Sequence, residues 1–571
     1  MKQDNLYKIR HSCEHVFNQA IEELWPGKIT RALGPPIENG WYNDSRWEVE
    51  VNEKDFPKIE KKMKEIIKKD LPITKKVISK SEAKELFKDN PFKQEILEGI
   101  EDKKVSIYST GDEFSDLCKG PHVKSTGEIK AFKLLSTAGA YWRGNEKNEM
   151  LTRVYGTAFP SQKELDKFLT TREEAIKRDH KKLGKALDLF VFSDLVGAGL
   201  PLWTPKGTLI RDLLDDFVWS IRKKKGYDKV EIPHITKKEL YIKSGHWDKF
   251  ADELFHIKTR EGHEFVMKPM NCPHHTQIFA RKLWSYKELP QRYSNTTMCY
   301  RDEQTGELNG LSRTRAFTQD DSHVFCTKEQ AKEEINSAWD IINEFYSRFE
   351  FKLKPRLSTH DPNNMKAYLG TSDIWKESED MLRNIAKDRG PELIEEPGEA
   401  AFYGPKIDFL ANDSLGREWQ VGTIQLDFNM PEAFKLNYVN EKGKKERVVM
   451  LHVAIMGSIE RFLSILIEHT AGNLPFWLSP EQIWIIPIGE GHHEYAKEVA
   501  KKLSEFRVVV KTESESLGKK IRAGELQKIP YLLIVGDKEM KNKKISVRFS
   551  NDGDLTSVRS FLHRLPFLKL P

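Results

Sequence analysis

The pattern of apolar and polar positions divides the chain into four stretches. In residues 1–161, strand-like runs such as "RALGPPIENGWYND" alternate with Lys- and Glu-rich helical runs such as "FPKIEKKMKEIIKK", as is typical of an α+β domain. Residues 162–189 are almost entirely charged and helix-forming, which predicts a linker helix. Residues 190–478 combine Val-, Ile-, Phe- and Trp-rich strands with long helices. In residues 479–571 strands alternate with helices, which predicts a small α/β domain with a mostly parallel sheet.

Composition narrows the class of protein. A chain of 571 residues is long enough for roughly three to five domains. The longest conspicuous apolar run, "IWIIPI", is too short to cross a bilayer, and the polar start "MKQDNLYKIR" has no signal-peptide core, so we expect a cytoplasmic protein with no membrane partner. The net charge of +6 does not by itself indicate nucleic-acid binding, because basic runs such as "RKKK" are usually solvated faces.

Five cysteines in a chain of this length do not form a disulfide framework, and two of them stand near histidines. "HSCEH" places His11 and His15 four residues apart, on one face if the segment is helical, and "DLCKGPH" supplies Cys118 and His122. These spacings suggest either a zinc site or a hydrolase with an unassigned nucleophile. A lone His323 in "QDDSHVF", by contrast, indicates only a hydrogen-bonded core histidine.

Two further segments are suited to binding phosphate. "MCYRDEQTGELNGLSRTRAF" predicts a strand, a glycine-containing loop and a strand, with Arg301 and Glu303 on one face of the first strand and Arg313 at the start of the second. Guanidinium groups held by a sheet suit a polyphosphate, although surface ion pairs are an equally simple interpretation. In "VVMLHVAIMGSIERFLSILIEH" a buried strand leads into a helix that Ser458 can cap, so Arg461 lies in its first turn, where anions are favoured.

The two arginine segments resemble motifs 2 and 3 of class II aminoacyl-tRNA synthetases, and "GYDKVEIPHI", with Pro233, is similar to motif 1, the dimer element. Five more segments, "MKPMNCPHH", "GLSRTRAFTQDDSHVF", "AFYGPKIDF", "REWQVGTIQLDF" and "HVAIMGSIERF", resemble the threonyl-tRNA synthetase family. The resemblance covers essentially the whole chain. It implies a class II antiparallel-sheet catalytic domain over 190–478, and ATP-dependent ligation of L-threonine to tRNA(Thr) through a threonyl-adenylate by a homodimer.

The resemblance also assigns residues to the catalytic site. Cys272, His323 and His452 match the family's ligands for one Zn²⁺ per chain, and Mg²⁺ accompanies ATP. Arg301 would hold the α-phosphate, Arg461 the γ-phosphate, with Glu303 beside them. The substrate pockets are assigned Asp321 for the threonine hydroxyl, Phe317 under adenine, and Gln319, Tyr403, Lys406, Gln420, Thr423, Ser458 and Arg313. His246 is expected either near the tRNA 3′ end or as a packing residue.

At the amino terminus, "GPPIENGWYND" and "GAYWRGNEKNEMLTRVYGTAF" resemble the editing domain shared by threonyl- and alanyl-tRNA synthetases, here 1–161. Serine differs from threonine by one methyl group, so hydrolysis of mischarged seryl-tRNA(Thr) is a physical requirement of this reaction. The resemblance gives that hydrolysis to six residues and favours a site without metal: His11, His15, Cys118, His122, Asp116 and Lys93. Because "HSCEH" begins at residue 11, we expect the family's small ubiquitin-like domain to be absent.

The carboxyl-terminal stretch 479–571 resembles the class IIa anticodon-binding domain, with Glu539 and Arg548 at matching positions. Ser514, Ser516 and Lys528 depart from the family's usual residues there. Two rival functions remain. A hydrolase acting on aminoacyl-tRNA would need only the first stretch and would leave the arginine motifs unexplained. An RNA-binding protein without catalysis would be expected to lack Arg301, Arg461 or a zinc ligand, and all are present.

Overall fold

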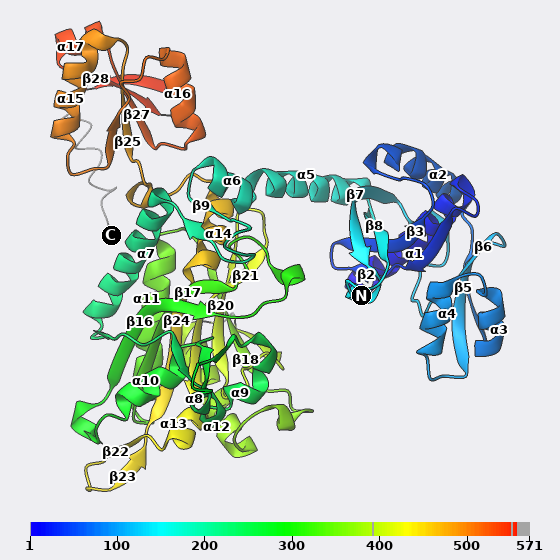
Figure 1. Ribbon diagram of the computed structural model, residues 1–571, viewed down its shortest axis with the longest axis horizontal. Helices are drawn as coiled ribbons and strands as arrows, with labels where there is room; N and C mark the ends of the chain where they lie inside the picture. The colour runs from blue at the N-terminus through cyan, green and yellow to red at the C-terminus, as the bar shows by residue number, and fades with distance from the viewer. Residues whose placement is uncertain (1, 391–392, 550–551, 557–571) are drawn as a thin grey trace. The chain divides into compact units, whose positions relative to one another are not determined.

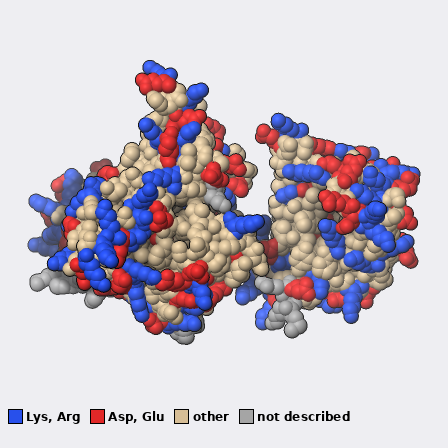
Figure 2. All heavy atoms as spheres, turned by 90° about the horizontal axis from the view of Figure 1, so that it is seen from below, with Lys and Arg blue, Asp and Glu red and all other residues tan. Residues whose placement is uncertain are grey.

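The computed structural model describes residues 2–390, 393–549 and 552–556 (Figure 1). The chain forms two compact units, Met1–Glu173 and Glu174–Pro571. Within the described residues, no helix is long and apolar enough to cross a membrane. Lysine and arginine side chains alternate with acidic ones over the faces seen in Figure 2, as the small net charge leads one to expect.

The first unit packs a long helix against an antiparallel sheet. The elements are helices α1 (Lys2–Leu24) and α2 (Phe56–Lys68) and strands β1 (Ile29–Leu33), β3 (Gly40–Trp47), β8 (Met150–Phe159) and β7 (Ala131–Tyr141), in sheet order β1-β3-β8-β7. The residues Val16, Phe17 and Ile21 of α1 are fully buried, with Phe17 against Trp41 of β3. Burial of this apolar face explains why α1 is helical despite a polar sequence.

A smaller sheet forms the other side of this unit. It consists of β4 (Ile73–Ser79), β5 (Lys104–Thr110) and β6 (Phe114–Leu117), covered by α3 (Lys80–Leu86) and α4 (Pro91–Glu98). The predicted single linker helix over 162–189 is wrong in one respect, because two helices, α5 (Gln162–Arg178) and α6 (His180–Ala186), meet at Asp179. The Asp179 side chain accepts a hydrogen bond from the backbone N–H of Lys181 and so begins the second helix.

An eight-stranded, mainly antiparallel sheet forms the centre of the second unit. Its order is β11 (Asp228–Lys229), β16 (Gln291–Tyr300), β17 (Ala316–Cys326), β24 (Val449–Ser458), β21 (Glu418–Asp427), β20 (Lys406–Asn412), β18 (Leu353–Thr359) and β19 (Ile394–Pro397), with parallel pairing only at the two edges. β16 ends at Tyr300 and β17 begins at Ala316. Arg301, Glu303 and Arg313 therefore lie in the connection and not on the strands, contrary to the sequence-based expectation.

Helices cover one face of this sheet. They include α7 (Pro205–Lys224), α11 (Ala331–Ser347) and α14 (Ile459–Thr470). The apolar stripe of α14, with Phe462, Leu463 and Leu466 all buried, joins the core that α7 and α11 form with the strands. The predicted cap of α14 is confirmed, since Ser458 Oγ accepts from the backbone N–H of Arg461 at 3.1 Å.

The carboxyl-terminal sheet has the order β26 (Val508–Val510), β25 (Ile483–Pro487), β27 (Tyr531–Val535), β28 (Ile545–Phe549) and β29 (Asp552–Thr556). The first three strands are parallel and are connected through α15 (His493–Lys502) and α16 (Leu517–Leu526). β28 and β29 are antiparallel additions, so the sheet is mixed where the sequence predicted a mostly parallel one. The connection from β27 to β28 contains the short helix α17 (Asp537–Asn542).

A buried ion pair ties α7 to the central sheet and leads to a stability prediction. Arg222 of α7 pairs with Asp320 of β17, and both side chains are almost completely buried. We expect Arg222→Met to lower the free energy of unfolding of this unit by about 3–5 kcal/mol, because the Asp320 carboxylate loses its cation in a site without water. Urea unfolding followed by tryptophan fluorescence measures this change. Lys223→Met, an exposed neighbour on the same helix, is the control, and equal unfolding midpoints for the two variants would contradict the assignment.

Candidate functional site

Strand alternation in the central sheet directs polar side chains into one cavity. Successive β-strand residues point to opposite faces, so Phe317, Gln319, Asp321 and His323 of β17 share a face. They line a cavity of about 510 Å³. The neighbouring strand β24 contributes His452, Ala454, Met456 and Ser458 in the same alternation. The register pairs His323 directly with His452, Asp321 with Ala454 and Gln319 with Ser458.

Cys272 joins the two paired histidines at one end of this cavity. All three residues are buried, and their potential ligand atoms lie within 4.8 Å of one another. His452 Nε2 lies 3.0 Å from Asp427 Oδ2, which directs Nδ1 toward His323 Nε2, also at 3.0 Å. Burial lowers the pKa of His323 well below its ordinary value and raises that of the Cys272 thiol well above it.

This donor set fits a transition-metal ion. When His452 donates from Nε2 to Asp427, its Nδ1 presents a lone pair to His323 Nε2, and a shared cation satisfies both nitrogens. Two nitrogens bound to one tetrahedral zinc ion lie roughly 3.3 Å apart, close to the 3.0 Å seen here. A thiol held beside two neutral imidazoles becomes a thiolate on coordination. The cluster of one sulfur and two nitrogens suits zinc and leaves a ligand position free.

Asp321 presents a carboxylate to the same end of the cavity. Its Oδ2 accepts from Asn271 Nδ2 at 3.1 Å, and Asn271 is in turn held by Lys268 Nζ at 2.8 Å. Its Oδ1 lies 3.8 Å from His323 Nε2. Burial raises the pKa of Asp321 to about 6. Asn271 and Lys268 were not singled out from the sequence, although both belong to the segment "MKPMN" that precedes Cys272.

Two arginines line the other end of the cavity. Arg301 lies over the Phe317 ring, 5.2 Å from its centroid, and its buried Nε has no hydrogen-bond partner among the described residues. Arg461 lies at the start of α14, 6.0 Å from the Trp419 ring centroid, and is exposed. Neither guanidinium forms an ion pair within the described part of the chain. Such free donors beside a helix N-terminus suit a phosphorylated ligand.

A fully buried carboxylate, Asp408, organises the wall between these ends. It pairs with Lys406 at 2.9 Å and accepts from Gln420 and Thr423 at 2.7 and 2.8 Å. Arg356 lies 3.2 Å from its second oxygen. Lys406, Gln420 and Thr423, which were expected in the cavity from the sequence, are thus held in place by Asp408, which the sequence analysis did not identify. A Lys-x-Asp pair on a strand, as in "KIDF", gives no sign that the aspartate is buried.

Two expected site residues, Glu303 and Arg313, do not line the cavity. They pair with each other, Glu303 Oε2 and Arg313 Nη2 lying 2.7 Å apart, and Arg313 also contacts Glu307. Tyr403 and His246 do line it. His246 is fully buried, with Nδ1 2.8 Å from Ser244 Oγ and Nε2 lacking a partner among the described residues.

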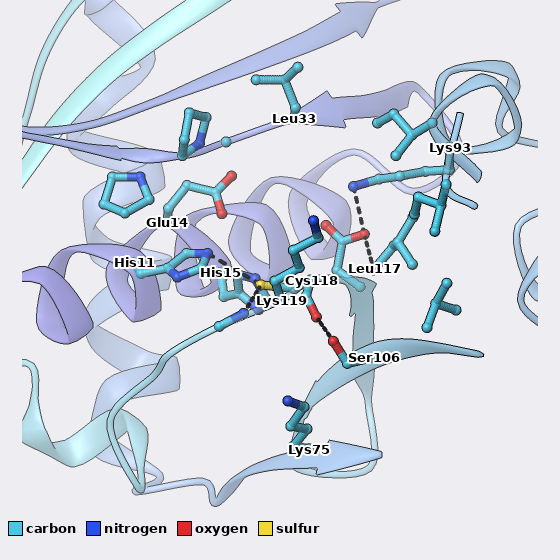
Figure 3. A pocket seen from close by; sticks show the side chains of 18 of the residues that line it. His11, Glu14, His15, Leu33, Lys75, Lys93, Ser106, Leu117, Cys118 and Lys119 are labelled. Atoms are coloured by element: carbon cyan, nitrogen blue, oxygen red, sulfur yellow. Dashed lines mark hydrogen bonds and ion pairs between the residues drawn. The ribbon is translucent and has the colours of Figure 1, made fainter. Parts of the chain in front are cut away.

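The first unit contains a second cavity, of about 650 Å³, lined by His11, His15 and Cys118 of the amino-terminal cluster, whereas His122 contacts Cys118 and is not among the lining residues. Figure 3 shows His11, Glu14 and His15 extending from α1 toward Cys118, which follows β6. The potential ligand atoms of His11, His15, Cys118 and His122 lie within 4.8 Å of one another. The two sequence segments, more than a hundred residues apart, therefore form a single site.

Cys118 is held as a neutral thiol between two histidines. His11 Nδ1 lies 3.1 Å from the Pro121 carbonyl oxygen, to which it can donate only from Nδ1–H, so its Nε2 is left as an acceptor. Cys118 Sγ lies 3.3 Å from that nitrogen and 3.2 Å from His122 Nε2. Burial raises the pKa of Cys118 to about 12 and lowers the pKa values of His11 and His122. The cluster is thus a set of neutral acids and bases.

Lys93 and Asp116 form an ion pair at the same cavity, 2.8 Å apart and both buried, as Figure 3 also shows for Lys93. Arg31 lies 3.6 Å from the other oxygen of Asp116. Although burial raises the pKa of Asp116, these two cations hold it below its ordinary value. Asp116 is consequently an ionised group that fixes the position of Lys93.

In the carboxyl-terminal domain the expected contact residues are engaged locally. Glu539 is buried, and its oxygens accept from the backbone N–H of Gly536 at 3.0 Å and from Ser546 Oγ at 2.7 Å. Arg548 pairs with Glu525 at 3.1 Å. Ser516 caps α16. Glu539 therefore shapes this domain from within, whereas Arg548 keeps a partly exposed guanidinium.

Comparisons with known proteins agree with this arrangement. Three families match the chain: "tRNA synthetase class II core domain (G, H, P, S and T)" over residues 255–470, "Threonyl and Alanyl tRNA synthetase second additional domain" over 105–155, and "Anticodon binding domain" over 482–560. The threonine–tRNA ligase of Flavobacterium johnsoniae is 49% identical over 544 residues, covering 94% of this chain and 84% of that relative. That of Porphyromonas gingivalis is 47% identical over 554 residues, covering 95% and 84%.

Among solved structures, the crystal structure of the RNA binding domain of threonyl-tRNA synthetase from Cryptosporidium parvum is similar with a TM-score of 0.65 and 37% identity. The similarity covers 69% of this chain and 99% of that one.

The thiol state of Cys118 leads to a prediction about its reactivity. With a pKa of about 12, the thiolate fraction at pH 7 is very small and rises about tenfold per pH unit up to pH 10. We expect alkylation of Cys118 by iodoacetamide, followed by mass spectrometry of the full chain, to accelerate in the same way, whereas a free cysteine levels off above its pKa of about 8.5. A rate that is already constant at pH 7 would indicate a thiolate–imidazolium pair and contradict this description.

Proposed function

This chain belongs to the threonine–tRNA ligase family, and on that premise we propose that its two cavities perform the two halves of one task. The cavity on the central sheet activates L-threonine with ATP and transfers it to tRNA(Thr). The cavity of the first unit hydrolyses seryl-tRNA(Thr). The observation that carries the proposal is the register of β17 and β24, which brings Asp321, His323 and His452 to one end of a cavity and Arg461 to the other.

In activation the threonine carboxylate attacks the α-phosphate of ATP. The protein contributes by positioning the two reactants and by neutralising the negative charge of the phosphates. Arg301 is proposed to hold the α-phosphate, because its guanidinium lies near Phe317, which would stack under the adenine. Arg461, at the capped start of α14, is proposed to hold the γ-phosphate. Mg²⁺ would accompany the nucleotide. Gln319, Tyr403, Lys406, Gln420, Thr423 and Ser458 complete the walls.

Selection of threonine is assigned to the end of the cavity at Asp321. Its carboxylate would accept a hydrogen bond from the substrate hydroxyl, and Asn271 fixes it in place for that purpose. Valine offers no hydroxyl, so a buried acceptor would be left unpaired, which can exclude an analogue by about 10⁴- to 10⁵-fold. Cys272, His323 and His452 would hold a zinc ion. When bound, that ion supplies a Lewis-acid site for the substrate's amine and hydroxyl.

Serine carries the same amine and hydroxyl and lacks only a methyl group, worth roughly 1–3 kcal/mol in a well-shaped pocket. A hydrolytic site is therefore needed. His11, His15, Cys118 and His122 supply neutral acids and bases around the ester, and the Asp116–Lys93 pair supplies a fixed cation. The neutral state of Cys118 favours hydrolysis by water over attack by the sulfur.

The remaining assignments follow from the family. We propose editing over 1–161, a linker over 162–189, catalysis over 190–478 and anticodon binding over 479–571. The enzyme would act as a cytoplasmic homodimer. Arg548 is the preferred anticodon contact, since Glu539 is occupied by Gly536 and Ser546. Glu303 and Arg313, which pair with each other and do not line the cavity, would act on the catalytic site only indirectly.

The metal assignment predicts zinc content. The purified chain should contain about one zinc ion, and Cys272→Ser, His323→Ala or His452→Ala should each reduce the bound amount severalfold after dialysis. Cys326→Ser is the matched control, because Cys326 is buried on β17 away from the cluster. Elemental analysis measures the result. Full zinc occupancy in His323→Ala protein would overturn the ligand set.

The editing assignment predicts a selective defect. His11→Ala combined with His15→Ala should slow deacylation of preformed seryl-tRNA(Thr) by at least about 100-fold, because general acid–base groups are lost. Threonylation of tRNA(Thr), which takes place in the other unit, should remain within about twofold of wild type and serves as the control. Equal deacylation rates for the two proteins would return these histidines to a structural role.

A further inference from the structure

Glu14 lines the editing cavity but has no part in the hydrolysis described above. It lies on α1 between His11 and His15, and its side chain points to the same side as theirs (Figure 3). Residues 11, 14, 15 and 18 share this face because they are three or four positions apart in a helix. Glu14 is 2% exposed, and burial at this depth is energetically unfavourable for an ionisable group.

Uncharged groups fix one oxygen of this carboxyl. Asn18 Nδ2 and Asn43 Nδ2 each donate to Oε1 at 2.7 Å. Asn43 is itself held by Asn18 Oδ1 at 2.9 Å and by Ser45 Oγ at 2.7 Å. The chain also closes tightly over this oxygen, since a Cβ atom on Gly34 would lie only 1.8 Å from Oε1. The carboxyl group is therefore held rigidly, and only a glycine at position 34 allows it.

The other oxygen, Oε2, has no hydrogen bond or ion pair among the described residues. The second buried carboxylate of the cavity, Asp116, is already paired with Lys93 and Arg31. Glu14 is thus the buried carboxyl of this cavity that lacks a cation within the described part of the chain. Burial raises its pKa to about 8, even though the hydrogen bond from Asn43 and the charge of Lys93, which is itself paired with Asp116, act in the opposite direction. A cation bound beside it would restore the charge.

The exposed lining is mainly of the opposite sign, with three lysines against one carboxylate, Asp102. Lys75, Lys104 and Lys119 are exposed at the same cavity, where they suit the phosphates of an RNA end. An aminoacyl ester at such an end carries one positive group, its α-ammonium, next to the ester carbonyl. The inner, rigid and cation-free carboxyl of Glu14 is complementary to that group, and it lies beside the histidines that would act on the carbonyl.

We propose that Glu14 binds the α-ammonium group of the aminoacyl ester in this cavity and so positions the ester against His11, His15 and Cys118. The inference rests on the editing function proposed above. Glu14 is a positioning and specificity residue here: it selects α-amino esters over other acyl esters, and it does not distinguish serine from threonine.

The test compares two stable amide analogues of the aminoacyl end, 3′-(L-seryl)amino-3′-deoxyadenosine and the same molecule with 3-hydroxypropanoyl in place of seryl, which lacks only the α-amine. Their Kd values for the full chain are measured by calorimetry at pH 7 with saturating L-threonine present, so that the amine site of the activation cavity is occupied. Wild type should bind the seryl analogue at least about tenfold more tightly. In Glu14→Gln the ratio should fall to within twofold of one, with the affinity for the analogue lacking the amine unchanged. Glu50→Gln, an exposed carboxylate in the same unit, is the control and should keep the wild-type ratio.

A wild-type ratio near one overturns the proposal, as does a Glu14→Gln protein that keeps the wild-type ratio. If Glu14→Gln does not fold, Glu14→Asp replaces it: the shorter carboxylate should reduce the ratio at least threefold, and an unchanged ratio overturns the proposal. Deacylation of seryl-tRNA(Thr) by wild type separates this result from the broader claim. Hydrolysis without the predicted ratio removes only the role of Glu14, whereas absence of both hydrolysis and binding removes the editing function as well.

Discussion

The structure of the second unit depends on the partners of the polar side chains of β17, which are buried on both faces of the sheet. Asp320 lies on the helix-covered face, where the guanidinium of Arg222 balances its negative charge. Its Oδ2 also accepts hydrogen bonds from the backbone N–H groups of Ile455 and Met456. These two hydrogen bonds come at a register shift, where β17 and β24 move out of simple pairing. The irregularity is thus anchored by an ion pair, and it determines how the ends of the two strands approach each other.

On the opposite face, the same alternation produces the active site. With Asp320 committed to the core, Asp321 and His323 must face the cavity, and His452 meets His323 by direct cross-strand pairing. The helix that follows β24 begins at Ile459, directly after its cap Ser458, which brings Arg461 to the other end of the cavity. One strand pair therefore sets the distance between the group proposed to select the amino acid and the group proposed to hold the nucleotide. The editing cavity uses another solution, in which one helix and a distant loop bring four neutral side chains together.

Much of this could be predicted from the sequence, and what was missed has physical causes. The run "RALGPPIENGWYND" was predicted to be strand-like and overlaps β1 and β3, and Ser458 caps α14 as its position indicated. The histidine cluster on the central sheet could be recognised only by family resemblance, because His323 and His452 are 129 residues apart and only sheet register brings them together. Asp408 was missed because alternation does not reveal which face of a strand is buried. Glu303 and Arg313 were placed on strands because the pattern did not show where pairing stops.

The central claim is that the activation site selects by the hydroxyl group and leaves the methyl group to the editing site. ATP–pyrophosphate exchange with threonine, serine and valine tests it most directly, because it measures activation without transfer or hydrolysis. The account predicts exchange with threonine, weaker exchange with serine by roughly 10- to 200-fold, and exchange with valine lower than with threonine by at least about 10⁴-fold. Activation of valine at the level of serine would contradict it, because Asp321 and the cluster beside it would then not be selecting the hydroxyl group.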